Sequence, residues 1–155
     1  MALLTALPDQ ILSVNLVPAE RGNPGAMREI GEAIQRCAYA VTTSNTKFEA
    51  QQIDAQLRSE AAANRSGRPV TTAEEAQKVE KAVENKKALD ESCSHIDPKQ
   101  IGSGLRWLER AADAGDLQAM RDYIQTAFDG YLEHGMQPSD LDEAKRRRDR
   151  VRQYA

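Results

Sequence analysis

The sequence predicts an all-α protein in which five to six helices form an antiparallel α-α hairpin stack or bundle behind a short irregular N-terminal extension. Residue types that favour helices, notably Ala, Glu, Gln, Lys and Arg, are frequent among its 155 residues. Apolar residues recur at spacings of three and four, which is the period of an amphipathic helix. Cap residues followed by proline mark helix starts, and glycine marks a helix end.

One domain is expected, because 155 residues suffice for a single core, which an aromatic content of 5% makes mainly aliphatic. We divide the chain into an extension over 1–22 and a helical domain over 23–155, with N-terminal helices over 23–96 and a hairpin plus C-terminal helix over 97–155. The formal net charge of -3 mixes both signs, so no global field attracts nucleic acid or an acidic membrane. No apolar run approaches the roughly 18 residues that cross a bilayer, so no membrane span is expected.

Caps and apolar stripes predict the first three helices. Asn23 as N-cap and Pro24 at the first helical position begin a helix of about 18 residues. A second helix is expected over 46–64, and the segment "NRSGRPVTT" after it predicts a loop. Thr72 and Glu75 have capping-box spacing and begin a third helix. The stripes are Met27, Ile30, Ile34, Cys37 and Val41, then Ala50, Ile53, Leu57 and Ala61, then Val79, Ala82, Val83, Leu89 and Cys93.

Three further helices are expected in the C-terminal part. Asp97 followed by Pro98 repeats the cap-plus-proline signal of a helix start. Gly115 marks the helix end, because glycine is the residue type most often found just past one. These signals predict a fourth helix over about 98–114. Asp116 caps a fifth helix, and "EHGMQPSD" ends it. A sixth helix is expected from Leu141 toward the C-terminus. The stripe of the fifth helix, the strongest in the chain, is Met120, Tyr123, Ile124, Ala127, Phe128 and Tyr131.

The fourth helix carries two adjacent apolar stripes on a helical wheel. A helix with so wide an apolar arc usually touches two neighbours, and Gly104, Ala111 and Ala114 are small enough to let one of them come close. The stripes are Ile101, Leu105, Leu108 and Ala112, and beside them Gly104, Trp107, Ala111 and Ala114. The opposite, charged side holds Arg106, Glu109, Arg110 and Asp113.

The segment "GLRWLERAADAG" over 104–115 resembles the Sel1-like repeat of bacterial proteins, a relative of the tetratricopeptide repeat. An aromatic-hydrophobic pair precedes a double alanine and a glycine turn, and "HGMQPSDLDEAKRRR" is similar to the ending of that repeat. The resemblance covers one degenerate repeat over 104–148, with no second copy elsewhere, and implies a hairpin of a protein-binding α-α stack. A plain helical bundle is the alternative. The matching residues are Trp107, Leu108, Ala111, Ala112, Gly115, Asp116, Ala119, Gly135, Asp140 and Ala144.

The two cysteines, Cys37 and Cys93, lie on apolar stripes, so both are expected inside the protein. A disulfide between them would tie the first and third helices and imply an oxidising compartment, whereas two buried free thiols are the alternative. The start, "MALLTALPDQILSVNL", lacks the basic n-region of an intact signal peptide. Because Sel1-like proteins of bacteria are often exported, the resemblance implies a periplasmic or otherwise exported protein if a signal peptide was removed beforehand, with a cytoplasmic protein as the alternative.

Enzyme signatures are absent from the sequence: it has no phosphate loop, no nucleophile elbow and no carboxylate-histidine metal motif. A metal site at Cys93 and His95 lacks further ligands at zinc spacing. A catalytic Cys-His pair conflicts with a buried Cys93, because a reactive thiol needs an exposed, electropositive setting. No catalytic residue, metal or cofactor is therefore expected.

The segment "KRRRDRVR" over 145–152 is the one basic cluster in the sequence. It suits contact with phosphate or an acidic surface, but cations in a last helical turn also complement the helix dipole, which is the interpretation we favour. Sequence-specific DNA binding would need a recognition helix and a wider basic face. The candidates for contact with an anionic surface are Lys145, Arg146, Arg147 and Arg148.

These observations predict a non-catalytic protein-protein interaction module of a bacterium, either an adaptor or an inhibitor or immunity protein that masks a secreted enzyme or toxin. The alternative is a nucleic-acid or anionic-surface binder that uses the basic C-terminal helix. Tryptophan and arginine dominate binding hot spots, and Trp107 becomes an anchor for a partner if it lacks an internal neighbour. The candidate partner-binding residues are Trp107, Arg106, Arg110 and Arg121.

Overall fold

The computed structural model describes residues 6–42 and 72–155, and this part of the chain is all-α, without a strand. The predicted fold class is confirmed. The predicted helix over 46–64 and the loop after it, up to residue 71, lie outside the described residues. The helices are α1 (Pro8–Glu20), α2 (Pro24–Thr42), α4 (Thr72–Ser94), α5 (Pro98–Ile101), α6 (Gly104–Asp113), α7 (Leu117–Thr126), α8 (Asp129–His134), the 3-10 helix η2 (Pro138–Asp140) and α9 (Leu141–Tyr154).

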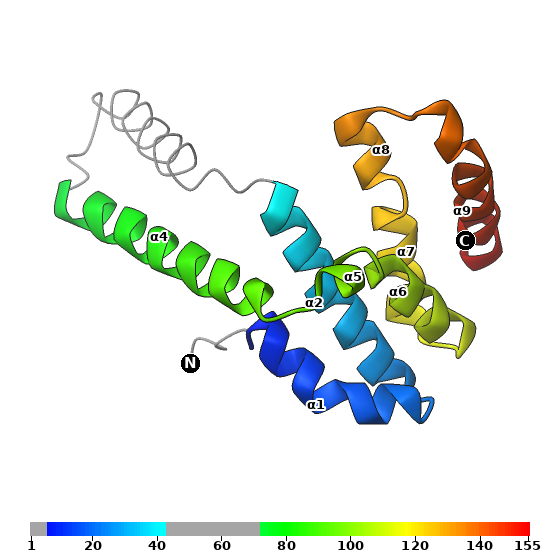
Figure 1. The fold of residues 1–155 in the computed structure, drawn as a ribbon, viewed down its shortest axis with the longest axis horizontal. Helices are drawn as coiled ribbons and strands as arrows, with labels where there is room; N and C mark the ends of the chain where they lie inside the picture. The colour runs from blue at the N-terminus through cyan, green and yellow to red at the C-terminus, as the bar shows by residue number, and fades with distance from the viewer. Residues whose placement is uncertain (1–5, 43–71) are drawn as a thin grey trace.

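Four helices stack in the order α1, α2, α6 and α7, and each contacts the next (Figure 1). Their shared core is aliphatic, as the composition predicts, and alanines at its centre let the helices approach closely. Leu12, Leu16, Trp107, Met120 and Tyr154 pack around it, partly buried. The buried residues of this core are Ala19, Ala26, Met27, Ile30, Ile34, Ala111, Ala112 and Ala119.

The predicted irregular extension is wrong, because residues 8–20 form helix α1. Pro8 does not interrupt the chain: it occupies the first helical position, where no intrahelical N–H bond is lost. Pro18 does lie inside the helix, at a local cost, but α1 packs along α2 through Leu12 and Leu16, and this burial offsets that cost. The prediction that the segment lies on the helices is confirmed.

The α1–α2 and α6–α7 hairpins turn in the same way. Gly22 and Gly115 both have φ of +94°, and each donates its N–H to the carbonyl three residues earlier, at 3.0 and 2.9 Å. The next residues, Asn23 and Asp116, donate to the carbonyl five residues earlier, which completes a Schellman ending in both hairpins. Their side chains then accept the N–H three residues further on. The sequence analysis finds no second copy of this hairpin, but the structure contains a second hairpin with an equivalent turn.

Two glycines let α6 cross α2 closely. A Cβ at Gly31 of α2 would lie 2.8 Å from the Cγ of Leu108, and one at Gly104 would lie 3.1 Å from the Gly31 carbonyl oxygen. The predicted close approach at Gly104 is therefore confirmed. Ala111 is buried at this contact, whereas Ala114 is exposed at the helix end and does not contribute.

The predicted fourth and fifth helices are each broken in two. Residues 102–103 form a turn between α5 and α6, in which the Ser103 hydroxyl donates to the Gln100 carbonyl at 2.6 Å. Residues 127–128 separate α7 from α8, and just before them the Thr126 hydroxyl donates to the Asp122 carbonyl at 2.8 Å. Such bonds compete with continuation of a helix.

The third predicted helix exists as α4, which approaches α1 and α2 at its C-terminal end while its start reaches away from the stack (Figure 1). Cys93 is buried there, and Leu89 is partly buried beside it. The helix from Leu141 is also confirmed, as α9. It packs on α7 at the other end of the molecule, where Val151 and Tyr154 surround the buried ring of Tyr123.

Candidate functional site

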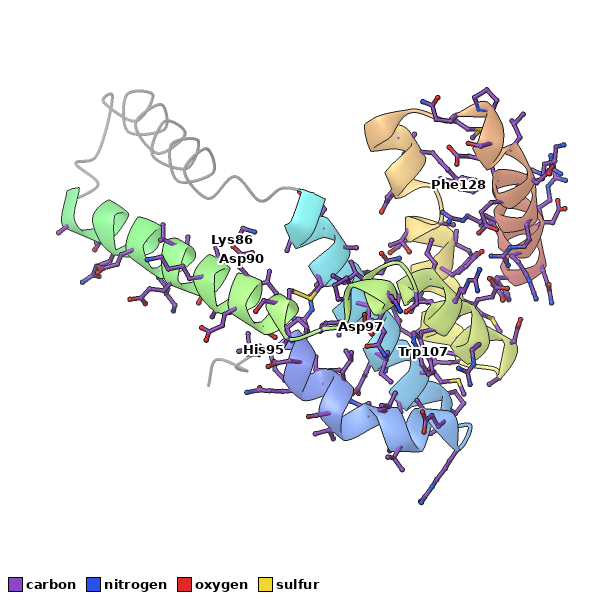
Figure 2. All side chains as sticks on the ribbon, in the orientation of Figure 1. Lys86, Asp90, His95, Asp97, Trp107 and Phe128 are labelled. Carbon is purple, nitrogen blue, oxygen red and sulfur yellow. A yellow bond between two sulfur atoms is a disulfide. The ribbon has the colours of Figure 1, made fainter. Side chains whose placement is uncertain are left out.

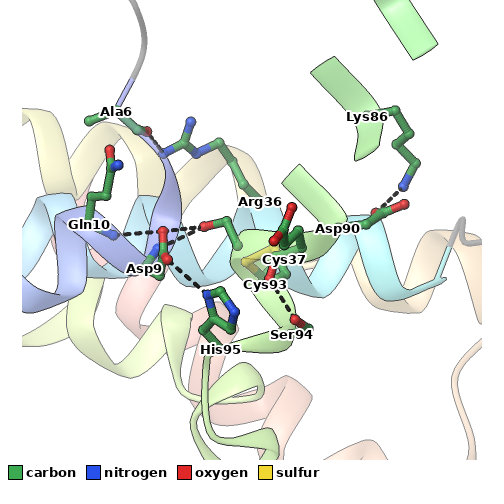
Figure 3. Close-up of a disulfide and its surroundings, with 12 residues drawn as sticks. Ala6, Asp9, Gln10, Arg36, Cys37, Lys86, Asp90, Cys93, Ser94 and His95 are labelled. Carbon is green, nitrogen blue, oxygen red and sulfur yellow. Dashed lines mark hydrogen bonds and ion pairs between the residues drawn. A yellow bond between two sulfur atoms is a disulfide. The ribbon is translucent and has the colours of Figure 1, made fainter. Parts of the chain in front are cut away.

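A disulfide joins Cys37 of α2 to Cys93 of α4, and both residues are buried (Figure 3). This confirms the predicted bridge over the alternative of two free thiols. The bridge is compatible with an exported protein, because disulfides persist in oxidising compartments. It also rules out the Cys93 thiol as a metal ligand or nucleophile.

A polar cluster beside the disulfide holds the start of α1 against the end of α4. The Ser92 hydroxyl donates to the Asp9 carboxylate at 2.6 Å and accepts the Asp9 backbone N–H at 3.0 Å. His95 Nδ1 lies 3.1 Å from the other Asp9 oxygen. The hydrogen bond from Ser92, and after it the one from His95, lowers the pKa of Asp9. The sequence analysis misses this cluster because it predicts no helix at Asp9.

This cluster differs from a Ser-His-Asp triad in its order. A triad places the imidazole between hydroxyl and carboxylate, so that the imidazole takes the hydroxyl proton. Here the carboxylate of Asp9 lies between Ser92 and His95. Ser92 is also only 2% exposed, and its hydroxyl is bonded on both sides to Asp9. The arrangement links the start of α1 to the end of α4 through hydrogen bonds.

The charged side of α6 contacts α9. Arg146 Nη1 donates to both carboxylate oxygens of Glu109 at 2.7 Å, and Arg150 Nε lies 3.3 Å from the same carboxylate. Arg150 also pairs with Asp113 at 3.0 Å, and the Tyr154 hydroxyl donates to Asp113 at 2.8 Å. The side chain of Glu109 is only 13% exposed as a result. The charged face of α6, which a helical wheel alone would leave in solvent, is therefore partly covered by α9.

Glu143 organises the middle of α9. Arg146 donates to both of its oxygens at 2.9 Å, and Arg147 Nε donates to one of them at 2.9 Å. The hydrogen bond from Arg146 is the main reason that the pKa of Glu143 falls to about 2. Arg147 Nη1 also donates to the Ala127 carbonyl, at 2.9 Å, in the break between α7 and α8. This arginine thereby satisfies a carbonyl that the break releases.

The four basic candidates of the C-terminal helix thus lie close to acids. Arg146 and Arg147 are held by Glu143 and by the contacts to α6 and Ala127. Arg148 pairs with Asp149 at 3.0 Å. Lys145 is 3.8 Å from Asp142, and its side chain is 62% exposed. The structure does not gather these four cations into an open basic face.

An open groove of about 320 Å³ lies between α6 and α9. Its two acids have partners already: Glu109 has Arg146 and Arg150, and Asp113 has Arg150 and Tyr154. Arg106 and Arg110 of α6 are exposed, and neither forms an ion pair within the described part of the chain. The residues that line the groove are Arg106, Glu109, Arg110, Asp113 and Arg146.

Trp107 has an internal neighbour. It lies where α6 faces α2 (Figure 2), partly buried against the core that includes Met27 and Ile30. The guanidinium carbon of Arg110 lies 4.5 Å from the centre of its ring, in a cation-π contact. The condition for Trp107 as an independent anchor is therefore not met, and its contact with Arg110 links it to the groove instead. Arg121 is exposed on α7 and does not line the groove.

Comparisons with protein-family models, with curated proteins and with solved structures returned no match. The site is therefore interpreted from its own geometry. Among the described residues, no helix combines the length and the apolar character that a bilayer span needs. Within the same residues, no group of three or more His, Cys, Asp or Glu side chains is placed to hold a metal ion.

Proposed function

We propose that the chain is a non-catalytic module of a bacterium that binds another protein, and that the groove between α6 and α9 is its binding surface. The observation that carries the proposal is the state of the two arginines: Arg106 and Arg110 line the groove without an ion-pair partner among the described residues, while both acids beside them are paired. Arginine is enriched in binding hot spots because its guanidinium makes several hydrogen bonds at once.

The architecture supports the same proposal. Two α-α hairpins with equivalent Gly-Asx turns stack through α2 and α6. Stacked hairpins of this kind create extended surfaces for partners. This stacking agrees with the Sel1-like resemblance over 104–148, which we keep as part of the proposal.

The proposed role is that of an adaptor, or of an inhibitor or immunity protein that masks a secreted enzyme or toxin. The Cys37–Cys93 disulfide supports a periplasmic or otherwise exported location, because a masking protein of a secreted enzyme works in the same oxidising compartment. The nucleic-acid alternative has less support. Its candidates Arg146, Arg147 and Arg148 each face a carboxylate within 3.0 Å, so their charge is largely compensated.

Affinity capture from the source bacterium tests the proposal when wild type is compared with two matched variants. Arg106→Glu/Arg110→Glu reverses the charge of the groove. The control, Arg121→Glu, reverses an exposed arginine outside it. We expect wild type and the control to enrich the same protein, and the groove variant to lose it while its circular dichroism is unchanged. Equal enrichment by all three would contradict the proposal.

A further inference from the structure

We infer that the groove recognises an acidic segment of the partner, with Arg106 and Arg110 as its carboxylate ligands. The inference rests on the proposed function and adds the chemistry of the bound segment. Its first basis is the charge balance of the groove. Three guanidinium groups and two carboxylates line it, and the two carboxylates are already engaged by Arg146, Arg150 and Tyr154. No described residue compensates the positive charge of Arg106 and Arg110 in an ion pair, so this charge can attract a ligand.

The second basis is that the Arg110 side chain is held in place before a ligand binds. Its guanidinium lies over the Trp107 ring, 4.5 Å from the ring centre. Stacking uses the face of the guanidinium and leaves its N–H edge free to donate to a carboxylate. Because Trp107 is itself packed against the core, this contact restricts the side chain before a ligand arrives. A restricted side chain loses less entropy on binding.

The third basis is the spacing of Arg106 and Arg110 along α6. Arg106 and Arg110 are four residues apart on α6, which places them on one side of the helix about 6 Å apart along its axis. Two carboxylates on successive turns of a partner helix have the same separation. A single α-helical segment with Glu at i and i+4 can therefore meet both arginines.

The small number of available cations favours a protein segment over a nucleic acid. Among the described residues that line the groove, Arg106 and Arg110 form no ion pair, whereas Arg146, Arg147 and Arg148 of α9 each lie against a carboxylate. Two arginines one helical turn apart match two separated carboxylates of a peptide better than a continuous row of phosphates, which needs a wider basic face. Nucleic acid is therefore the outcome that the test must separate from the acidic segment.

Peptide titration tests the inference. The probe is a fluorescein-labelled alanine-based peptide with Glu at every fourth position, and the matched control peptide has Gln in place of Glu. Fluorescence anisotropy reports binding, and the intrinsic fluorescence of Trp107, the one tryptophan of the chain, locates it beside Arg110. We expect saturable binding of the Glu peptide, weaker at high salt because surface charge contacts are screened. The Gln peptide should not bind.

The variants complete the test. Arg106→Gln/Arg110→Gln should weaken binding of the Glu peptide about tenfold, as expected for the loss of two surface charge contacts. Arg121→Gln should leave binding unchanged. Absence of saturable binding, equal binding of the Gln peptide, equal loss in Arg121→Gln, or tighter binding of oligothymidylate would each overturn the inference.

The two proposals can fail separately. If affinity capture depends on Arg106 and Arg110 but the Glu peptide does not bind, the partner's segment is not acidic and the binding role stands. If the Glu peptide binds in the groove but capture does not depend on these arginines, the chemistry of the groove stands and the proposed function fails.

Discussion

Gly31→Ala tests the close crossing of α2 and α6, which positions the groove. The added Cβ would meet the Cγ of Leu108 at 2.8 Å, its Cδ2 at 2.9 Å and the Gly104 carbonyl oxygen at 3.0 Å. Leu108 is 1% exposed and the carbonyl is backbone, so neither yields easily. Overpacking of this kind costs about 3 kcal/mol, from which a helix-propensity gain of about 1 kcal/mol is subtracted. We expect unfolding to be easier by about 2 kcal/mol and the melting temperature to fall by about 6 °C.

Gly130→Ala is the matched control, because Gly130 also lies in a helix but has open space around its Cβ position. The same propensity gain should stabilise this variant by up to about 1 kcal/mol. Urea unfolding followed by circular dichroism measures both variants on one scale. If Gly31→Ala is as stable as Gly130→Ala, α6 does not cross α2 at Gly31, and the stacked arrangement is refuted.

Three further predictions concern the disulfide, the hydroxyl groups of Tyr123 and Tyr154, and the α9 ion pairs. Cys37→Ala/Cys93→Ala opens a link between residues 56 positions apart and should cost about 4 kcal/mol in urea unfolding, whereas an unchanged midpoint under oxidising conditions would contradict the bridge. Tyr123→Phe removes a hydroxyl without a partner among the described residues and should not lower stability, whereas Tyr154→Phe loses a 2.8 Å bond and should cost about 1 kcal/mol; the reverse order would refute the assignment. The pKa of Glu143 is lowered from 4.5 to about 2, so its stabilisation is present above pH 4.5 and is lost as pH falls toward 2. The difference in urea midpoint between wild type and Glu143→Gln should shrink over that range, and a constant difference would contradict the ion-pair account.

Features set by neighbouring residues could be predicted from the sequence. Asn23 and Asp116 cap helices because their side chains accept N–H groups three residues away, and Gly115 turns the chain because it tolerates a positive φ. Helix α1 could not be predicted in the same way. Pro18 lies inside it and argues locally against a helix, and the opposing term, burial of Leu12 and Leu16 on α2, depends on tertiary packing.

The candidate site could be predicted only in part, because some of its contacts are local in sequence and others join distant segments. The helical wheel places Arg106 and Arg110 together on the charged side of α6, and they do line one groove. The partners of Glu109 come from Arg146 and Arg150 of α9, far along the sequence, so local pattern does not reveal which charges remain unpaired. Local pattern does not predict the break after α7 either, since the Arg147 side chain that satisfies the Ala127 carbonyl lies 20 residues away in the sequence.

The central claim is that Arg106 and Arg110, which line the α6 groove without an ion pair to any described residue, hold a partner protein. The most direct measurement is the dissociation constant of the captured partner for wild type, Arg106→Gln/Arg110→Gln and Arg121→Gln at one salt concentration. The account predicts about tenfold weaker binding for the groove variant and no change for Arg121→Gln. Equal affinity of all three proteins for the partner would contradict it.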